Sequence, residues 1–259
     1  MSKNETEIKI SALIITYNEE KHLEKCLSSL KSVADEIIVV DSYSTDRTID
    51  ICNEHGVKVI MQEFLGYREQ KNFAIEQAQY NYILSLDGDE ALSDQLKQSI
   101  LELKKNWEYD GYLVNRRNRY CGQWIKHSDW YPDRKLRLFK KGSGLWKGIN
   151  PHDTYVLKSK LTQTRIKGDL LHYIFDSYSE HNKKIEKFST ISAQEYYKLG
   201  KSASIFKIIF RPSWAFFKAY FLRRGFLDGF NGFVISVQTA NLTFLKYAKL
   251  RALYKSETK

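Results

Sequence analysis

The chain has 259 residues, of which 41 are Lys or Arg and 31 are Asp or Glu, and 42% of all residues are hydrophobic. Such a chain can bury a sizeable core, and 13 Gly, 3 Pro and 14% aromatic residues exclude collagen-like and disordered chains. Cys26, Cys52 and Cys121 show no CxxC spacing. We therefore expect a reducing compartment and neither a disulfide framework nor a structural zinc site.

The first 120 residues alternate strand-like and helix-like patterns. Short apolar runs alternate with stretches whose apolar residues follow helical spacing, which favours a mostly parallel sheet covered by helices on both faces. The expected strands are Ile8–Ile15, Ile37–Val40, Val57–Met61 and Tyr82–Leu86, and the expected helices start near Leu23, Thr48, Tyr67 and Ser93.

The second half is less regular and strongly basic. Residues 1–120 hold 15 Lys/Arg against 21 Asp/Glu, whereas residues 121–259 hold 26 against 10. The basic half is expected to face an anionic partner: nucleic acid, a membrane or a phosphorylated substrate. Its pattern predicts short strands at Tyr112–Asn115, Leu136–Phe139 and Leu170–Tyr173, then a helix over Glu180–Leu199, then an aromatic helical part from Ser204 onward.

Polar residues follow three of the expected strands: Thr16-Tyr17-Asn18-Glu19, Asp41-Ser42 and Asp87-Gly88-Asp89-Glu90. Ligands of parallel sheets bind at the carboxyl ends of strands, so these groups are candidate ligand contacts, although turn and cap roles are the alternative. Crowded carboxylates favour a hard cation, and Mg²⁺ or Mn²⁺ often bridges such oxygens to substrate phosphates. The sequence contains no G-x-x-x-x-G-K-[ST], and no G-x-G-x-x-G follows the first strand. A bound nucleotide would therefore have to be held by a metal, by side chains and by the strand-end loops.

The motifs ISALIITYNEE, EIIVVDSYSTDRT and GYREQKNFAIEQAQYNYILSLDGDE resemble those of family-2 glycosyltransferases with the GT-A fold. The stretches WIKHSDWYPDRKLRLFKK, GINPHDTY, LLHYIF and FLRRGFLDGFNGF resemble, more narrowly, bacterial lipopolysaccharide-core enzymes of that family. The resemblance implies an α/β, Rossmann-like, mostly parallel sheet flanked by helices, with a C-terminal helical extension. It implies a GT-A domain over residues 1–175 (donor part about 1–110, acceptor part about 111–175) and a basic, aromatic extension over 176–259.

The resemblance also implies a reaction. A hexose, with glucose as the expected sugar, moves with inversion from a UDP-linked donor to a saccharide acceptor of lipopolysaccharide core or a related envelope glycan, with Mg²⁺ or Mn²⁺ bound. Carried over to this sequence, the donor contacts are Thr16, Tyr17, Asn18, Glu19, Asp41, Lys71, Asn72 and Asp87. The metal ligands are Asp89, Asp87 and, completing the shell, His172. Tyr43 departs from the family's D-S-G-S-T-D, which leaves the roles of Ser42 and Ser44 open.

Inversion needs a base that takes the proton of the acceptor hydroxyl. Asp153 in Asn-Pro-His-Asp is the candidate, with Asp129 and Asp133 as competitors and a solvated loop acid as the alternative. His172 is equally compatible with a core histidine, and His152 with a phosphate contact. Leu136 and Leu138 alternate with Lys135 and Arg137, which predicts a half-buried strand with its basic residues outward.

The last 59 residues carry 11 Lys/Arg against 2 Asp/Glu, with aromatic residues interleaved. This composition favours peripheral contact with an anionic membrane, and packing onto the catalytic domain is the alternative. Residues 1–9 are polar and show no secretory signal, so we expect a cytoplasmic protein. We expect it to be peripheral at the inner face of the cytoplasmic membrane and to bind no nucleic acid. Two other functions remain open at this point: a metal-dependent nucleotidyltransferase and a nucleic-acid-binding protein. A nucleotidyltransferase normally has a Gly-rich basic loop after the first strand, and a nucleic-acid-binding protein normally has a recognised binding motif.

Overall fold

The computed structural model describes residues 8–148 and 153–257. The chain divides into two compact units: unit 1 comprises residues up to Arg116 and Arg134–Tyr173, and unit 2 comprises Arg117–Asp133 and the residues from Ile174 onward. Strands β6 (Gly111–Tyr120) and β11 (Gln163–Phe175) each continue from unit 1 into unit 2. Residues 117–133 thus belong to the same unit as the C-terminal helices.

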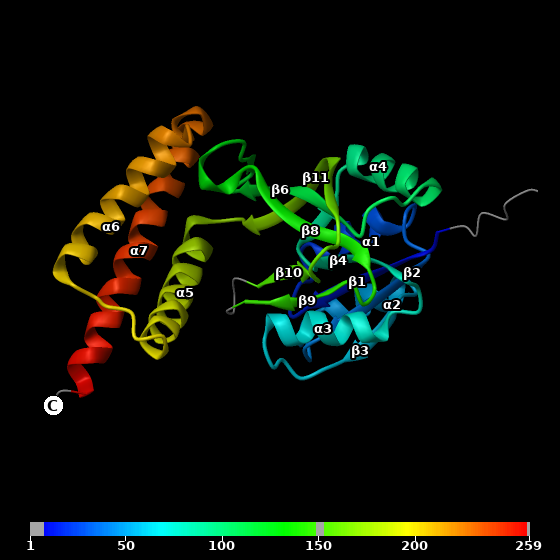
Figure 1. The fold of residues 1–259 in the computed structure, drawn as a ribbon, viewed down its shortest axis with the longest axis horizontal. Helices are drawn as coiled ribbons and strands as arrows, with labels where there is room; N and C mark the ends of the chain where they lie inside the picture. Colours follow the sequence, from blue (N-terminus) through cyan, green and yellow to red (C-terminus); the bar gives the residue numbers. More distant parts are fainter. Residues whose placement is uncertain (1–7, 149–152, 258–259) are drawn as a thin grey trace, which may run out of the picture. The chain divides into compact units, whose positions relative to one another are not determined.

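Unit 1 is built on a sheet whose first four strands are parallel neighbours in the order β3-β2-β1-β4 (Figure 1). These strands confirm the predicted α/β architecture: β1 (Ile10–Thr16), β2 (Glu36–Asp41), β3 (Lys58–Met61) and β4 (Tyr82–Asp87). The helices between and after them are α1 (Leu23–Leu30), α2 (Thr48–Glu54), α3 (Tyr67–Gln77) and α4 (Asp94–Lys105).

The same sheet continues beyond β4 through β8 (Asp133–Lys140), β6, β11 and β5 (Glu90–Leu92). The pairs β4–β8 and β11–β5 are antiparallel. The short strand β5, inside the acidic cluster, was not predicted; it pairs Glu90 with His172 of β11. A separate hairpin is formed by β9 (Gly144–Lys147) and β10 (Thr154–Leu157).

The run Ile10–Thr16 is mostly apolar because β1 is buried on both faces, and every one of its residues is buried. Its alternate side chains Ile10, Ala12 and Ile14 join the core formed with α1, α2 and α4. Leu13 and Ile15 join the core formed with α3. The central position of β1 fixes where its polar carboxyl end emerges, and that end begins the candidate site.

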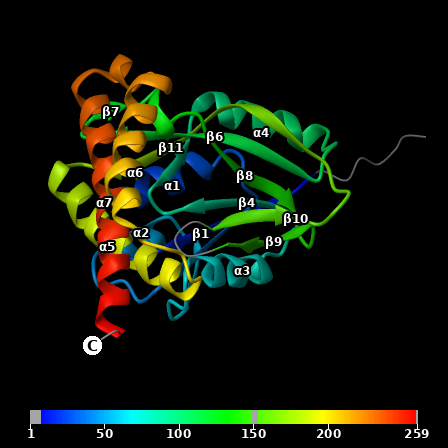
Figure 2. The ribbon, with the colours of Figure 1, turned by 60° about the vertical axis from the view of Figure 1, so that its left-hand side comes forward.

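In unit 2, helix α7 (Gly229–Glu257) runs along both α5 (Tyr178–Lys198) and α6 (Ile205–Phe217), as Figures 1 and 2 show. A π-helical turn (Lys218–Leu222) and a 3-10 turn (Gly225–Asp228) connect α6 to α7. A Cβ at Gly232 would lie 1.9 Å from the Gly225 carbonyl oxygen, so this crossing requires glycine. Buried Asp228 accepts from the backbone N–H of Lys126 (3.1 Å) and of His127 (2.8 Å). Asp228, which directly precedes α7, therefore holds the loop of Lys126 and His127 on the start of that helix.

His181 gives unit 2 a pH-sensitive core. Its ring stacks on Phe175 at 4.4 Å and its Nδ1 lies 2.9 Å from the Tyr120 hydroxyl. Burial, together with the charge of Lys184, lowers the pKa of His181 from 6.5 to about 4. The unfolded chain therefore binds a proton between these values that the folded chain does not, so stability is complete above pH 6.5 and falls as the pH drops toward 4.

We expect the free energy of unfolding to decrease by up to about 3 kcal/mol between pH 6.5 and pH 4 on account of this one group. Urea unfolding at a series of pH values measures the slope. In His181→Gln, which does not titrate, this contribution to the slope should be absent. An identical pH dependence in the variant and the wild type would contradict the assignment.

Candidate active site at the strand ends of unit 1

The three predicted polar strand ends meet at one edge of the sheet. In the parallel register Thr16 of β1 lies opposite Asp41 of β2, and Ile15 of β1 lies opposite Asp87 of β4. The loops after these strands then touch directly. A Cβ at Gly88 would lie 2.9 Å from the Thr16 hydroxyl and 3.2 Å from Glu19 Cγ, so glycine is needed for the β4 loop to approach the β1 loop.

Asp41 organises the first two loops. Its carboxylate is fully buried and accepts hydrogen bonds from the Ser44 backbone N–H (2.7 Å) and hydroxyl (2.5 Å). The Ser44 hydroxyl in turn accepts from Asn18 N–H (2.8 Å), and Asn18 Oδ1 accepts from Thr45 N–H (2.8 Å). The two loops are therefore joined by a closed set of hydrogen bonds that begins at Asp41.

Tyr43 lies in this loop with a φ of 62°, in the left-handed region. Glycine adopts this conformation at no steric cost, whereas a residue with a side chain is strained there by about 1–2 kcal/mol. The turn therefore keeps a glycine-like backbone although the sequence departs from D-S-G-S-T-D. The hydrogen bonds of Ser44 to Asp41 and Asn18 compensate for the substitution.

An alternating chain of buried and partly buried charges runs below the strand ends. Lys71 Nζ lies 3.0 Å from Asp153 Oδ2 and 3.1 Å from Asp87 Oδ1. The guanidinium of Arg137 lies 3.0 Å from Asp87 Oδ2 and 2.7 Å from Glu90 Oε1. Arg116 closes the chain, 3.5 Å from Glu90. Three carboxylates thus alternate with three cations, an arrangement in which each buried charge has an opposite neighbour.

The electrostatics of Asp87 follow from this arrangement. Burial alone would raise the pKa of its carboxyl, but the charges of Lys71, Arg137 and Arg116 more than offset it and hold the pKa far below the usual value. Asp87 is therefore ionised at all physiological pH values. Nearby Tyr67 shows the opposite effect, because burial and the charges of Asp87, Asp89 and Asp153 raise the pKa of its phenol.

Asp89 and His172 form a separate pair. His172 Nε2 lies 3.3 Å from Asp89 Oδ2, and the Tyr173 backbone N–H donates to the Asp89 carbonyl (2.9 Å), which fixes the loop on β11. Two adjacent ligands of an octahedral ion, each about 2.1 Å from it, are about 3 Å apart, so this pair fits two positions around Mg²⁺ or Mn²⁺. Within residues 8–148 and 153–257, no three His, Cys, Asp or Glu side chains form a metal-binding group.

The predicted set Asp87, Asp89 and His172 is therefore divided. Asp89 and His172 come together, whereas both oxygens of Asp87 face cations of the protein. In this arrangement Asp87 holds Lys71 and Arg137 in place.

Lys71 and Asn72 also have protein partners. Lys71 Nζ lies 4.5 Å from the centre of the Trp146 ring, in addition to its two carboxylates. The amide of Asn72 donates to the Trp146 carbonyl (3.1 Å) and accepts from its backbone N–H (3.0 Å). These contacts fasten α3 to β9 and thereby bring Lys71 to Asp153.

The prediction that the basic residues of Leu136–Phe139 point outward is wrong for Arg137. Its side chain is 3% exposed and ion-paired to Asp87 and Glu90, whereas Arg134 on the same strand is exposed. Sequence reasoning also missed Arg116 and Trp146 as members of the site, and it named Glu90 only as part of the acidic cluster after β4. For Arg137, the signal was a charged residue placed between two leucines in a buried strand.

The remaining predicted residues occupy varied positions. Asp153 is not a solvated loop acid, because its side chain is 5% exposed and paired with Lys71. Tyr17 is 59% exposed beside the loop junction, and His152 lies outside the described residues. Asp129 and Asp133 belong to unit 2, where Asp129 lies 3.2 Å from Lys218.

Comparison with known proteins places the chain in a family. The model of Glycosyl transferase family 2 matches residues 11–160. An uncharacterized glycosyltransferase of Rickettsia typhi is 35% identical over 95% of this chain and 87% of its own length. A lipopolysaccharide core biosynthesis glycosyltransferase of Rhizobium meliloti is 32% identical over 93% of this chain and 91% of its own. Residues 1–349 of S. aureus TarS resemble the chain in structure with a TM-score of 0.48 and 15% identity, covering 90% of each chain. On the strength of the family model and of the relatives at 32–35% identity, the chain belongs to glycosyltransferase family 2.

Proposed function

We propose that this family-2 glycosyltransferase moves a hexose, with glucose as the expected sugar, from a UDP-linked donor to a saccharide acceptor with inversion. The observation that carries the proposal is that Asp89, just after the parallel strand β4, lies beside His172 of β11, while Asp153 is joined through Lys71 to Asp87 at the end of β4. The acceptor proposed is a lipid-linked saccharide of lipopolysaccharide core, supported by the relative of that name in Rhizobium meliloti. Such an acceptor implies a reaction at a membrane surface. The nucleotidyltransferase and nucleic-acid-binding alternatives are set aside because the family is that of a glycosyltransferase.

In this proposal the joined loops of Asn18 and Asp41 receive the nucleoside. Their closed set of hydrogen bonds means that the backbone is already ordered before a ligand arrives, which lowers the entropic cost of binding. Exposed Tyr17 offers a ring for contact with the base, and Thr16 and Glu19 face the Gly88 turn. Lys71 and Arg137 supply positive charge close to the diphosphate.

A divalent cation at Asp89 and His172 would stabilise the negative charge that develops on the departing diphosphate. Asp153 is the proposed base, which takes the proton of the acceptor hydroxyl as that oxygen attacks the anomeric carbon. Lys71 holds Asp153 by Oδ2, so the acceptor hydroxyl reaches the carboxylate through Oδ1 or by displacing Lys71. The leaving group and the base then act on opposite sides of the sugar, as inversion requires.

The stereochemistry tests this function. The wild-type protein is incubated with UDP-α-glucose, Mn²⁺ and a truncated core saccharide, and the anomeric configuration of the product is read by NMR. The proposal predicts a β-glycoside. An α-glycoside would contradict inversion, and transfer from a GDP- or ADP-linked sugar only would contradict the UDP donor.

The metal site is tested by Mn²⁺ binding rather than by activity. In the presence of UDP, Asp89→Ala and His172→Ala should each weaken Mn²⁺ affinity by at least about tenfold, measured by electron paramagnetic resonance titration of free Mn²⁺. The matched control is His55→Ala, because the His55 ring contacts Glu24 and not Asp89. This variant should bind Mn²⁺ like the wild type. Unchanged affinity in His172→Ala would show that His172 is a core histidine.

A further inference from the structure

Helix α6 exposes its apolar face. Its exposed large side chains recur at intervals of three or four residues and continue into the following π-helical turn, so they lie on one side of the helix. This aromatic stripe consists of Phe206 (64% exposed), Phe210 (55%), Trp214 (57%), Phe217 (44%) and Phe221 (50%). Ile205 and Ile209 are exposed beside it.

The rings of the stripe contact one another in two groups. The rings of Phe206 and Phe210 stack at 4.1 Å, those of Trp214 and Phe217 stack at 5.8 Å, and the Phe221 ring is tilted against that of Phe217 at 5.3 Å. The turns after α6 extend it with further exposed apolar residues, Leu222, Phe226 and Leu227. Isolated exposed apolar residues are ordinary, but a contiguous apolar patch indicates an interaction site.

The opposite side of α6 already has a partner. Ala215 and Phe216 are partly buried, and Phe216 packs edge-on against Phe233 of α7 with centroids 6.0 Å apart. Helix α6 is therefore held on α7 by one face, and the aromatic stripe is not its packing face within unit 2. The alternative that these aromatics serve as core residues does not hold for the five rings of the stripe.

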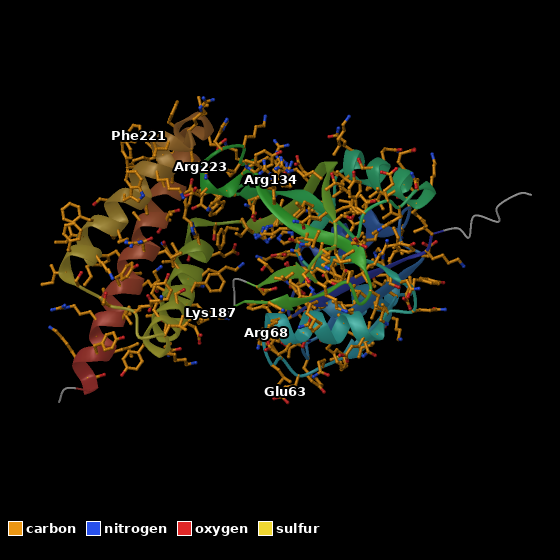
Figure 3. The ribbon with its side chains drawn as sticks, in the orientation of Figure 1. Glu63, Arg68, Arg134, Lys187, Phe221 and Arg223 are labelled. Carbon is orange, nitrogen blue, oxygen red and sulfur yellow. The ribbon has the colours of Figure 1, made fainter. Side chains whose placement is uncertain are left out.

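Basic residues outnumber acidic ones around the stripe, where Asp129 pairs with Lys218 and Arg223. Residues 196–227 contain no Asp or Glu. Five basic residues accompany the stripe: Lys207, Arg211, Lys218, Arg223 and Arg224. Arg211, Arg223 and Arg224 are exposed, and Figure 3 labels Phe221 and Arg223 near the end of α6.

We propose that the aromatic stripe of α6 docks the protein on an anionic phospholipid bilayer, with the helix lying in the plane of the interface. Aromatic rings prefer the boundary between lipid headgroups and acyl chains, and the basic residues match anionic headgroups. No helix within the described residues has both the length and the apolar character needed to cross a bilayer, which agrees with surface docking. A second copy of the chain is a poorer occupant, because two such faces would bring like charges together.

This inference goes beyond the proposed function by assigning the membrane partner to particular residues. It rests on the proposed function only for the reason that a lipid-linked acceptor makes docking useful. The contacts that define the stripe lie entirely within unit 2, so docking and catalysis are tested separately.

The test is flotation of the full chain with vesicles of pure phosphatidylcholine and of phosphatidylcholine containing 30% phosphatidylglycerol. The wild type should bind the anionic vesicles at least about tenfold more tightly, since the basic residues beside the stripe attract anionic headgroups. Phe206→Ser, Phe210→Ser and Trp214→Ser combined should lose binding to both kinds of vesicle. Lys207→Ala with Arg211→Ala should remove on the order of tenfold of the preference for anionic vesicles.

A matched control replaces exposed apolar residues elsewhere. Phe64 and Leu65 of unit 1 are 48% and 67% exposed, and Phe64→Ser with Leu65→Ser should bind vesicles like the wild type. Circular dichroism establishes that the stripe variant is folded. Its hydrolysis of UDP-glucose should be unchanged, so failure of docking and failure of the proposed function give different results.

Two outcomes would overturn the proposal. One is equal vesicle binding by the folded stripe variant and the wild type. The other is a wild type that binds no vesicles and is a dimer in sedimentation, with the stripe variant a monomer, which would assign the stripe to a second copy of the chain.

Discussion

Asp153→Asn is expected to lower the turnover number for transfer by roughly 10²–10⁴-fold, the contribution of a well-placed general base. Asparagine keeps the shape of the side chain but cannot take the proton of the acceptor hydroxyl. Donor affinity should change little, because Lys71 keeps its second carboxylate partner, Asp87, at 3.1 Å. Initial rates with saturating acceptor and calorimetric titration with UDP measure the two quantities separately.

The matched control for this variant is Asp129→Asn. Asp129 lies in unit 2 with Lys218 and Arg223 as ion partners, and we expect turnover near that of the wild type. Normal turnover in Asp153→Asn together with loss in Asp129→Asn would transfer the role of base to Asp129. A parallel loss of UDP affinity in Asp153→Asn would instead indicate that Asp153 mainly positions Lys71.

Arg137→Leu is expected to cost about 3–5 kcal/mol of folding stability, because it removes the cation that Asp87 and Glu90 share. Glu90 is fully buried, and Arg116, at 3.5 Å, would be its remaining ion partner. For a chain of this size the expected fall in melting temperature is roughly 10 °C. Differential scanning calorimetry measures it directly.

Two further variants separate the buried charge from simple loss of volume. Arg134→Leu changes an exposed arginine of the same strand and should shift the melting temperature little. Adding Glu90→Gln to Arg137→Leu removes the unpaired charge but keeps an oxygen for the Asp87 N–H, so part of the stability should return. If Arg137→Leu has the same melting temperature with and without Glu90→Gln, the network does not stabilise the fold through paired charges.

The parallel part of the fold could be predicted because its signals are local. Strands β1, β2 and β4 are mostly apolar since both of their faces are largely buried, and each ends in a polar residue at the same edge. The antiparallel strands beyond β4 are harder to predict. Strand β6 mixes buried and half-buried positions along Gly111–Tyr120, so neither period dominates.

The candidate site was predictable in its residues but not in its pairings. Asp89 and His172 were expected together, and the structure brings them to 3.3 Å. The link between Lys71 and Asp153 spans 82 residues, and no local pattern specifies a contact of that range. Arg137 was misplaced because alternation with leucine usually means an outward side chain, whereas here Asp87 and Glu90 provide charge inside the sheet. The domain limits of residues 1–175 and 176–259 remain a prediction.

The central claim is that the strand ends of unit 1 hold a metal-dependent site for a nucleotide sugar. Its most direct test is release of UDP from UDP-glucose by the wild type with Mn²⁺, by the wild type with EDTA, and by Asp89→Ala with Mn²⁺. Asp94→Ala is the control, since that acid is 97% exposed on α4. The site described above predicts UDP release by the wild type and the control with Mn²⁺ only, and none by Asp89→Ala. Release by Asp89→Ala at the wild-type rate, or the absence of binding to every nucleotide sugar offered, would contradict it.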